Sequence, residues 1–351
     1  MTNDQRQEAV SATWQAVASK EVMVQRALML KNIRAFFDAR DVLEVDTPLL
    51  SHCSITDPHL DSLPVRFREQ HCYLNTSPEY AMKRLLAGWH HPVYQVCKAF
   101  RDDELGLLHN PEFTMLEWYR PGFDMRQLMQ EMEALIRVLL SALTGAAPGE
   151  SATKTSSVKE QTEARFEYLS YRQAFIEQTN IDPHQATSQQ CLRFAQQNNV
   201  EIPQGLTADD AVDDWLDWLL MQVVQAAFCK DGFTFIYDYP ASQCALASIE
   251  DDGTGVAVAK RFELFYGELE LANGFFELTD AAEQLRRFQQ DNVQRQQTGK
   301  IVGDIDQRFI AALCHGLPAC SGVAVGLDRL LMVLTGKVRI EQVLSFPWHR
   351  A

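Results

Sequence analysis

Three widely separated segments of this chain limit its possible folds more than any other feature, because each combines a strand-like run with charged residues. The first, residues 36–48, reads as a helix end, a strand and a proline. The second, residues 100–119, contains two strand-like runs around a loop and includes the stretch HNPEFTMLEWY. The third, residues 322–330, is a glycine-bearing strand that turns into a helix, where backbone can approach a ligand closely.

The rest of the chain supplies further strands and helices around these segments. Strand-like runs are predicted at residues 42–45, 71–76, 93–100, 112–118, 233–237, 262–265 and 268–272. Helical periodicity is predicted at residues 22–40, 125–143 and 279–297. Runs of strands with helices appended favour an α+β fold with an antiparallel sheet flanked by helices.

The organisation predicted from these patterns is one large catalytic domain over residues 21–351, preceded by a leader at residues 1–20. Residues 144–164 are rich in Gly, Ser, Thr and Ala without an apolar period, so we expect a flexible linker there. Residues 170–230 are predicted to form a mostly helical insertion.

Composition narrows the classes of partner and compartment. The net charge of the 351-residue chain is −15, which argues against a nucleic-acid partner, because phosphate contacts need Lys or Arg. The eight cysteines form no Cys-x-x-Cys pair, which argues against a zinc site and a disulfide framework. The polar N-terminus and the absence of a run of roughly 20 apolar residues favour a cytoplasmic protein without membrane association.

The order and separation of the three segments resemble motifs 1, 2 and 3 of the class II aminoacyl-tRNA synthetases. The stretch HNPEFTMLEWY is typical of the lysine branch of that class. Within the branch, the chain most resembles lysyl-tRNA-synthetase paralogues that attach a lysine-type amino acid to elongation factor P. The similarity runs from about residue 22 to the C-terminus and includes TSPEY at 76–80, PASQ at 240–243 and ELANG at 270–274.

This resemblance implies a two-step ligase. ATP and (R)-β-lysine, or lysine, would give an adenylate, and a lysine of elongation factor P would then accept the aminoacyl group. The resemblance also implies a homodimer, since the first motif builds a dimer interface in this class. Only about 20 residues precede that motif, so we expect no anticodon-reading β-barrel and no tRNA partner. A catalytically silent regulatory paralogue and a truncated lysyl-tRNA synthetase remain as alternatives.

Activation requires that phosphate charge be neutralised and that both reactants be held in line. Arg101 suits the α-phosphate because a guanidinium binds phosphate oxygens bidentately, and Arg329 has the corresponding role in the third motif. We expect both to be catalytic. Glu263 and Glu270 resemble the family's ligands for the Mg²⁺ that accompanies ATP. By resemblance the further contacts of ATP are Asp103, His109, Asn110, Phe113, Glu270, Leu271 and Gly326.

A second set of residues corresponds to the family's amino-acid site. Glu79 would meet an amino group near the reacting end. Glu117, Tyr119 and Glu277 would hold the distant ammonium. Burying carboxylates without a cation is costly, so an unoccupied acidic pocket implies a cationic ligand. The expected set also includes Ser77, Pro78, Asn273 and Ala324.

Several positions depart from the family patterns. Ala324 stands where the synthetases have glycine, and this change accompanies preference for β-lysine over α-lysine in the family. Asp103 is one methylene shorter than the usual glutamate, and Glu104 would replace it only if the strand register slipped. Leu107 and Leu108 stand where relatives commonly carry Arg or Tyr. Because the phosphate-binding arginines are intact, we still expect an active enzyme.

Overall fold

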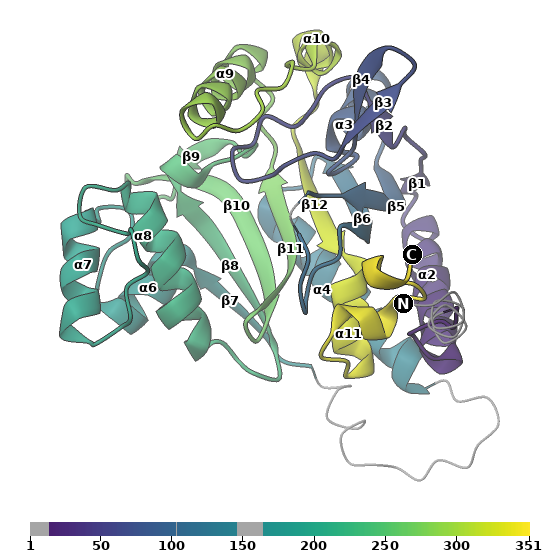
Figure 1. The fold of residues 1–351 in the computed structure, drawn as a ribbon, viewed down its shortest axis with the longest axis horizontal. Coiled ribbons are helices and arrows are strands. Elements are labelled where there is room, and N and C mark those ends of the chain that lie inside the picture. The colour runs from purple at the N-terminus through teal and green to yellow at the C-terminus, as the bar shows by residue number, and fades with distance from the viewer. Residues whose placement is uncertain (1–13, 103, 146–163) are drawn as a thin grey trace, which may run out of the picture.

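The computed structural model describes residues 14–102, 104–145 and 164–351 (Figure 1). Its central sheet has the order β1 (Leu43–Glu44), β5 (Val93–Phe100), β6 (Glu112–Pro121), β12 (Cys320–Gly326), β11 (Leu269–Phe276), β10 (Ala257–Tyr266), β8 (Phe233–Pro240) and β7 (Phe166–Ser170), with β9 (Ile249–Asp251) paired to β10. From β5 to β8 all neighbours are antiparallel, whereas β1 pairs in parallel with β5 and β7 with β8. The expected α+β fold is confirmed, with a parallel pair at each edge of its sheet.

The helices fall into three groups around this sheet. The first group is α2 (Lys20–Asp38), α4 (Met125–Gly145) and α11 (Leu327–Thr335); the second is α3 (Glu79–Trp89), α9 (Ala281–Gln297) and α10 (Gln307–Gly316); the third is α6 (Tyr171–Thr179), α7 (Ser188–Gln197) and α8 (Val212–Leu219), followed by the π-helix η1 (Leu220–Val224) and the 3₁₀ turn η2 (Gln225–Ala227). A small second sheet consists of β2 (Leu50–Ser51), β4 (Gln70–Leu74) and β3 (Pro64–Phe67), and short 3₁₀ turns occur at η3 (Ala241–Gln243), η4 (Ile340–Val343) and η5 (Trp348–Arg350).

Local sequence accounts for the elements that carry the three motifs. Ser19 begins α2 by accepting a hydrogen bond from the backbone N–H of Val22, and the buried side chains of α2 recur at helical spacing. In β6 the side chains alternate, so that Trp118 points into the core while Glu117 and Tyr119 point to the other face. The sequence therefore places polar groups on one face and apolar groups on the other.

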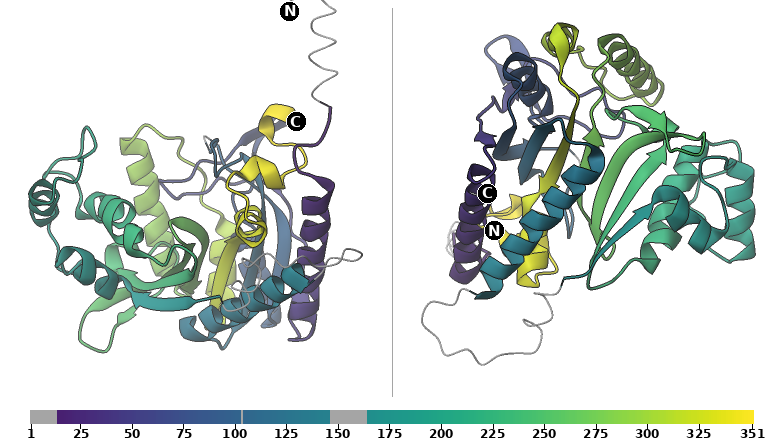
Figure 2. Two further views of the ribbon diagram at one scale, coloured as in Figure 1. Left: turned by 90° about the horizontal axis from the view of Figure 1, so that it is seen from below. Right: turned by 180° about the vertical axis from the view of Figure 1, so that it is seen from behind.

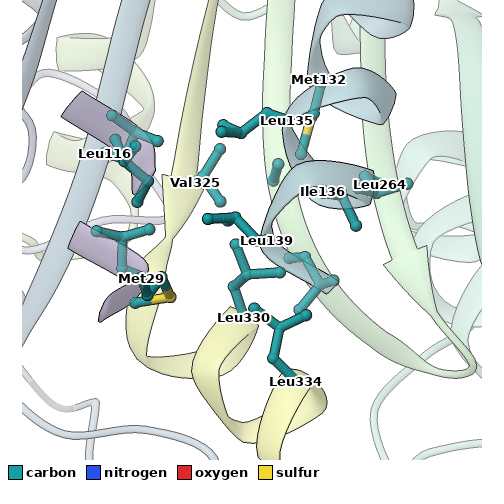
Figure 3. Close-up of a cluster of buried hydrophobic side chains, with 14 of the residues drawn as sticks. Met29, Leu116, Met132, Leu135, Ile136, Leu139, Leu264, Val325, Leu330 and Leu334 are labelled. Atoms are coloured by element: carbon teal, nitrogen blue, oxygen red, sulfur yellow. The ribbon is translucent and has the colours of Figure 1, made fainter. Parts of the chain in front are cut away.

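The main core lies on one face of the sheet, under α2, α4 and α11. Figure 2 shows α4 lying across this face, seen from behind. Figure 3 shows the packing, in which Met29 of α2, Leu139 of α4 and Leu330 of α11 surround Leu116 and Val325 of the central strands. All five side chains are almost fully buried. Such packing fixes β6 and β12, two of the strands that carry the candidate site.

The opposite face, turned to the viewer in Figure 1, is covered only at its two ends. At one end α3, α9 and α10 pack over Val93 and Cys320. At the other end α6, α8 and η1 pack over Ile236 and Phe265. The middle of this face, on β6, β12 and β11, is left to polar side chains.

The strand and helix predictions held best for long elements. β5 begins and ends at the expected residues, and helices occupy much of residues 170–230 as expected. The helices α3 and α10 were missed. The leader at 1–20 and the linker at 144–164 fall mainly outside the described residues, apart from residues 14–20, 144–145 and 164. None of the described helices is long and apolar enough to cross a membrane.

Candidate active site

A single row across the uncovered sheet face brings together residues from four strands. Glu117 of β6 lies opposite Ala324 of β12, Ala324 lies opposite Asn273 of β11, and Asn273 lies opposite Glu263 of β10. Directly opposite residues of antiparallel strands project on the same face. Four of the predicted site residues, separated by up to 207 positions in the chain, therefore line one strip of the sheet.

Beside this row, buried carboxylates form what we call the amino-acid pocket, made of Glu79, Lys83, Glu117, Tyr119 and Glu277. Glu117 is 2% exposed, and its two oxygens accept hydrogen bonds from the hydroxyls of Ser77 (2.7 Å) and Tyr119 (2.5 Å). The Ser77 hydroxyl also accepts from the backbone N–H of Glu79, the first residue of α3 after Pro78. The structure thus brings together the predicted amino-acid contacts at one end of the row.

Lys83 was not among the predicted residues. Its ammonium nitrogen lies 2.5 Å from a carboxylate oxygen of Glu79 and 2.6 Å from one of Glu277, and its side chain is fully buried. The inference that an acidic pocket must obtain its cation from a ligand is therefore incomplete, because the protein supplies one cation itself. The spacing of Glu79 and Lys83, one helical turn apart, is the sequence signal that would have revealed the pair.

Two carboxyl groups of the pocket have pKa values well above the ordinary value of a glutamate. Burial, reinforced by the charge of Glu79, raises the pKa of Glu117 to about 7. Burial also raises the pKa of Glu277 to about 8, although the ammonium of Lys83 opposes the shift. Burial lowers the pKa of Lys83, but Glu277 and Glu79 outweigh that effect and the net shift is upward, so Lys83 stays charged.

Gly322 also has a role in the pocket that the sequence argument did not predict, although that argument placed it in the third motif. A Cβ atom at this position would lie 2.3 Å from the ring of Tyr119 and 2.5 Å from a carboxylate oxygen of Glu277. Only glycine lets these two side chains close over the strand at this point.

The groups expected to bind phosphate lie further along the strands, where β5 ends, β6 begins and β12 runs into α11, and we call Arg101, His109 and Arg329 the nucleotide end. Arg329 donates to the backbone carbonyls of Glu270 (2.9 Å) and Leu108 (3.3 Å) and contacts the ring nitrogen of His109. Burial and the nearby Arg329 lower the pKa of His109, which favours a neutral ring that can accept this hydrogen bond. The predicted His109 and Arg329 are thus neighbours.

Arg101 is held differently. Its guanidinium lies 3.3 Å from a carboxylate oxygen of Glu104 and 5.1 Å from the ring centroid of Phe113. Glu104, which the register argument set aside, is therefore the carboxylate that meets Arg101 in the described residues. Asp103 lies outside them.

Other predicted nucleotide contacts have mainly structural partners. Asn110 donates to the carbonyl of Glu112 and accepts from the backbone N–H of Trp348. The side chain of Leu271 is buried in the main core, so only its backbone remains for a ligand. Gly326 precedes α11 as its N-cap, and a Cβ there would meet nothing closer than 3.9 Å.

A β-bulge brings the two candidate metal ligands to the same face. The pairing of β10 with β11 shifts between Leu264 and Phe265, so that Phe265 lies opposite Glu270. This shift turns Glu270 toward the face that carries Glu263. Burial and the charge of Glu263 raise the pKa of Glu270 to about 7, and Arg261 contacts Glu263.

These two carboxylates fit a magnesium ion that is shared with a polyphosphate. Mg²⁺ usually takes one or two protein carboxylates and completes its shell with phosphate oxygens and water. Burial and the charge of Glu263 both raise the pKa of Glu270, and a divalent cation would oppose this shift. Among residues 14–102, 104–145 and 164–351, no cluster of three or more His, Cys, Asp or Glu side chains is arranged to hold a metal ion by itself.

Asp328 joins the second and third motifs to α2, the helix that leads into the first motif. This buried carboxylate accepts from the backbone N–H of Thr114 in β6 (2.7 Å) and pairs with Arg26 of α2. The two motifs and this helix therefore meet at one charged group, immediately before Arg329. The sequence argument gave Asp328 no role because its partners lie 214 and 302 positions away.

An antiparallel sheet that carries an arginine at a strand-to-helix turn, a second arginine after a neighbouring strand and two carboxylates on one face is the architecture of the class II synthetases. The family model described as tRNA synthetases class II (D, K and N) matches residues 3–350, and the chain belongs to this family. Among its curated relatives, "Elongation factor P--(R)-beta-lysine ligase" of Hamiltonella defensa is 44% identical over 347 residues, covering 97% of this chain and 99% of the relative.

Two further relatives carry the same name. The protein of Pseudoalteromonas translucida is 44% identical over 96% of this chain and 98% of its own length. The protein of Salmonella typhi is 42% identical over 97% of this chain and 99% of its own length. The resemblance inferred from the motifs is confirmed at the level of both the family and its named relatives.

Proposed function

We propose that this chain is a ligase that activates (R)-β-lysine, or lysine, with ATP and transfers it to the ε-amino group of a lysine on elongation factor P. The observation that carries the proposal is the buried amino-acid pocket on the same sheet face as Arg101 and Arg329, which lie further along the strands. Near-full-length relatives named for this reaction support it.

In the first step, a carboxylate oxygen of the amino acid attacks the α-phosphorus of ATP. The bond from that phosphorus to the bridging oxygen breaks, and pyrophosphate leaves with the electron pair. Arg101 stabilises the charge that develops on the α-phosphate, while Arg329 and His109 hold the distal phosphates. Phe113, whose ring lies beside the Arg101 guanidinium, would stack on the adenine.

Glu263 and Glu270 would hold Mg²⁺, which neutralises phosphate charge during the displacement. The amino acid would lie between the amino-acid pocket and the nucleotide end. Glu117, Tyr119 and Glu277 would surround its distant ammonium, and Glu79 the amino group near the reacting carboxylate. Asn273 would add a polar contact; its side-chain oxygen is buried and lacks a hydrogen-bond partner within the described residues.

In the second step, the neutral ε-amino nitrogen of the acceptor lysine attacks the carbonyl carbon of the adenylate. An amide bond forms, AMP leaves and the nitrogen loses a proton. The relatives' printed name supports elongation factor P as the acceptor. The net charge of −15 supports a protein acceptor over tRNA, since a tRNA backbone would be repelled.

Two further properties belong to the proposal. We expect a homodimer, because the first motif builds a dimer interface in this class and its strand β1 lies at the edge of the sheet with Leu43 and Glu44 exposed. We expect a cytoplasmic location, in keeping with eight free cysteines. Light scattering of the purified protein tests the first and fractionation of the source cells tests the second.

The test of the function is ATP–pyrophosphate exchange with (R)-β-lysine, α-lysine and no amino acid, followed by transfer to elongation factor P or to tRNA. We expect exchange with a lysine analogue and a mass increase of the protein acceptor by one lysyl residue. Charging of tRNA instead would identify a truncated synthetase. Absence of exchange with every amino acid would identify a silent paralogue and contradict the proposal.

A further inference from the structure

Lys83 is an unusual component of a binding pocket for a cationic ligand, because it places a positive charge where the ligand's charge must go. No part of its side chain is exposed, and a fully buried lysine is rare unless it is paired. Its ammonium bridges Glu79 of its own helix and Glu277, which follows β11. The rings of Tyr119 and Phe309 close the site, with centroids 6.0 and 5.9 Å from the nitrogen.

The bridge fixes the relative position of two carboxylates that would otherwise repel each other. Because both oxygens contact one nitrogen, they lie no more than about 5 Å apart. Without the ammonium, two such carboxyl groups would share a proton rather than both ionise. The ammonium of Lys83 therefore favours the anionic forms of both Glu79 and Glu277, against the opposing effect of burial.

Lys83 also sets the formal charge of the pocket. The titratable groups that face it come from α3, β6, the end of β11 and β12, and they are Glu79, Glu117, Tyr119, Glu277 and Cys320. Three carboxylates and one ammonium leave two formal negative charges. A diamino acid brings two ammonium groups, and its single carboxylate would face Arg101 and lose its charge in the mixed anhydride of the adenylate. The two formal negative charges of the pocket therefore match the two positive charges of the ligand.

We propose that Lys83 is a positioning residue that holds Glu79 and Glu277 in place and sets the pocket at two negative charges, so that the pocket selects amino acids with two ammonium groups. This inference deepens the proposed function and rests on it.

The first test is Lys83→Met, with Arg84→Met as the matched control that removes an exposed positive charge from the next position of α3. We expect Lys83→Met to raise the KM for (R)-β-lysine at least about tenfold in ATP–pyrophosphate exchange, with the KM for ATP unchanged within about twofold. The acidic limb of kcat/KM for the amino acid should move to higher pH, because the carboxyl groups lose their cation. Lys83→Arg should return that limb toward its original position.

The second test changes the formal charge of the pocket in two ways. Its expected outcome would not arise if Lys83 only filled space in the pocket. Glu277→Gln leaves one formal negative charge, whereas Lys83→Met/Glu277→Gln returns the pocket to two. We expect the double variant to have a lower KM for (R)-β-lysine than Glu277→Gln alone, by at least about threefold. It also removes the unpaired buried charge, so it remains informative where Lys83→Met alone fails to fold.

One-ammonium probes complete the design. Norleucine lacks the side-chain ammonium and 6-aminohexanoate lacks the α-amino group, so both should be poorer substrates for the unsubstituted enzyme. Glu277→Gln, which leaves one formal negative charge in the pocket, should narrow their disadvantage. The proposal is overturned if Lys83→Met leaves the amino-acid KM and the pH limb unchanged, or if the double variant is no better than Glu277→Gln. Failure of the proposed function would be distinct, because the unsubstituted enzyme would then exchange with no amino acid.

Discussion

The nucleotide end and the amino-acid pocket lie on the same sheet face but are built in different ways. At the nucleotide end, Arg101 and Arg329 are partly exposed and bind backbone carbonyls, His109 or the partly exposed Glu104. In the pocket, Lys83, Glu117 and Glu277 are at most 2% exposed and bind mainly one another or neighbouring hydroxyls.

This difference separates two tasks. Contacts of an exposed arginine with a carbonyl or a surface carboxylate are weak, so a phosphate can replace them at little cost. A buried network of fixed charges cannot rearrange cheaply, so the ligand has to match it. Damage to the nucleotide end should therefore abolish activation of every amino acid, whereas changes in the pocket should alter which amino acid is activated.

The largest effect is expected from Arg101→Ala. Loss of a guanidinium that stabilises charge in the transition state should lower ATP–pyrophosphate exchange by about 10³-fold with every amino acid. The thermal shift on adding (R)-β-lysine should remain, because the pocket is intact. Arg66→Ala, which removes an exposed arginine paired only with Glu69, serves as the control and should keep full exchange. Exchange within tenfold of the unsubstituted enzyme would exclude a catalytic role for Arg101.

Gly322→Ala should break the pocket while leaving the nucleotide end. Its Cβ would overlap the Tyr119 ring and the Glu277 carboxylate, so one of them must move. We expect the KM for the amino acid to rise by about 10²-fold, with ATP binding retained in calorimetry. Gly88→Ala is the matched control, since a Cβ there meets nothing within 4 Å. An equal loss of ATP and amino-acid binding would indicate general damage to the sheet instead.

The raised pKa values of the pocket predict a pH dependence confined to the amino acid. Glu117 and Glu277 ionise at about 7 and about 8, so kcat/KM for the amino acid should rise at least about tenfold between about pH 6 and about pH 8. Glu117→Gln should flatten part of this rise. A profile that is flat over this range would mean that the carboxyl groups are already ionised in the free enzyme.

The raised pKa values of Glu117 and Glu277 also determine whether the free energy of unfolding rises or falls with pH. Both carboxyl groups have pKa values above the ordinary 4.5, so the folded protein binds more protons than the unfolded chain between about pH 5 and about pH 8. The stability of the ligand-free protein should therefore fall as pH rises through this window. Added (R)-β-lysine should oppose the fall, and thermal unfolding with and without it measures both.

The same contrast explains what the sequence could and could not predict. Residues within a strand or a short motif were read correctly, as β5 and the strand-to-helix turn before Arg329 illustrate. Their joint placement on one row follows from alternation once the strand order is known. The structure supplied that order, since periodicity alone gives neither register nor neighbours.

Contacts that depend on distant partners were not predictable from local pattern. Lys83 meets Glu277 across 194 positions, and the bulge that turns Glu270 toward Glu263 has no local sequence signature. Asp328 likewise acquires its role only when α2 and β6 pack beside it. Such residues emerge from tertiary packing, which is why the pocket was predicted with its acids but without its internal cation.

The smallest and most specific change is Ala324→Gly. Ala324 lies between Glu117 and Asn273 on the row, so its methyl group borders the space between the distant-ammonium site and the polar contact near the reacting end. Removing it enlarges that space by one methyl, which should shift the preference between (R)-β-lysine and α-lysine toward α-lysine by up to about tenfold. The measurement is the ratio of kcat/KM for the two isomers at one pH. Because the nucleotide end is untouched, the KM for ATP should not change. A parallel loss of both isomers would show that the methyl group supports the strand rather than the choice of substrate.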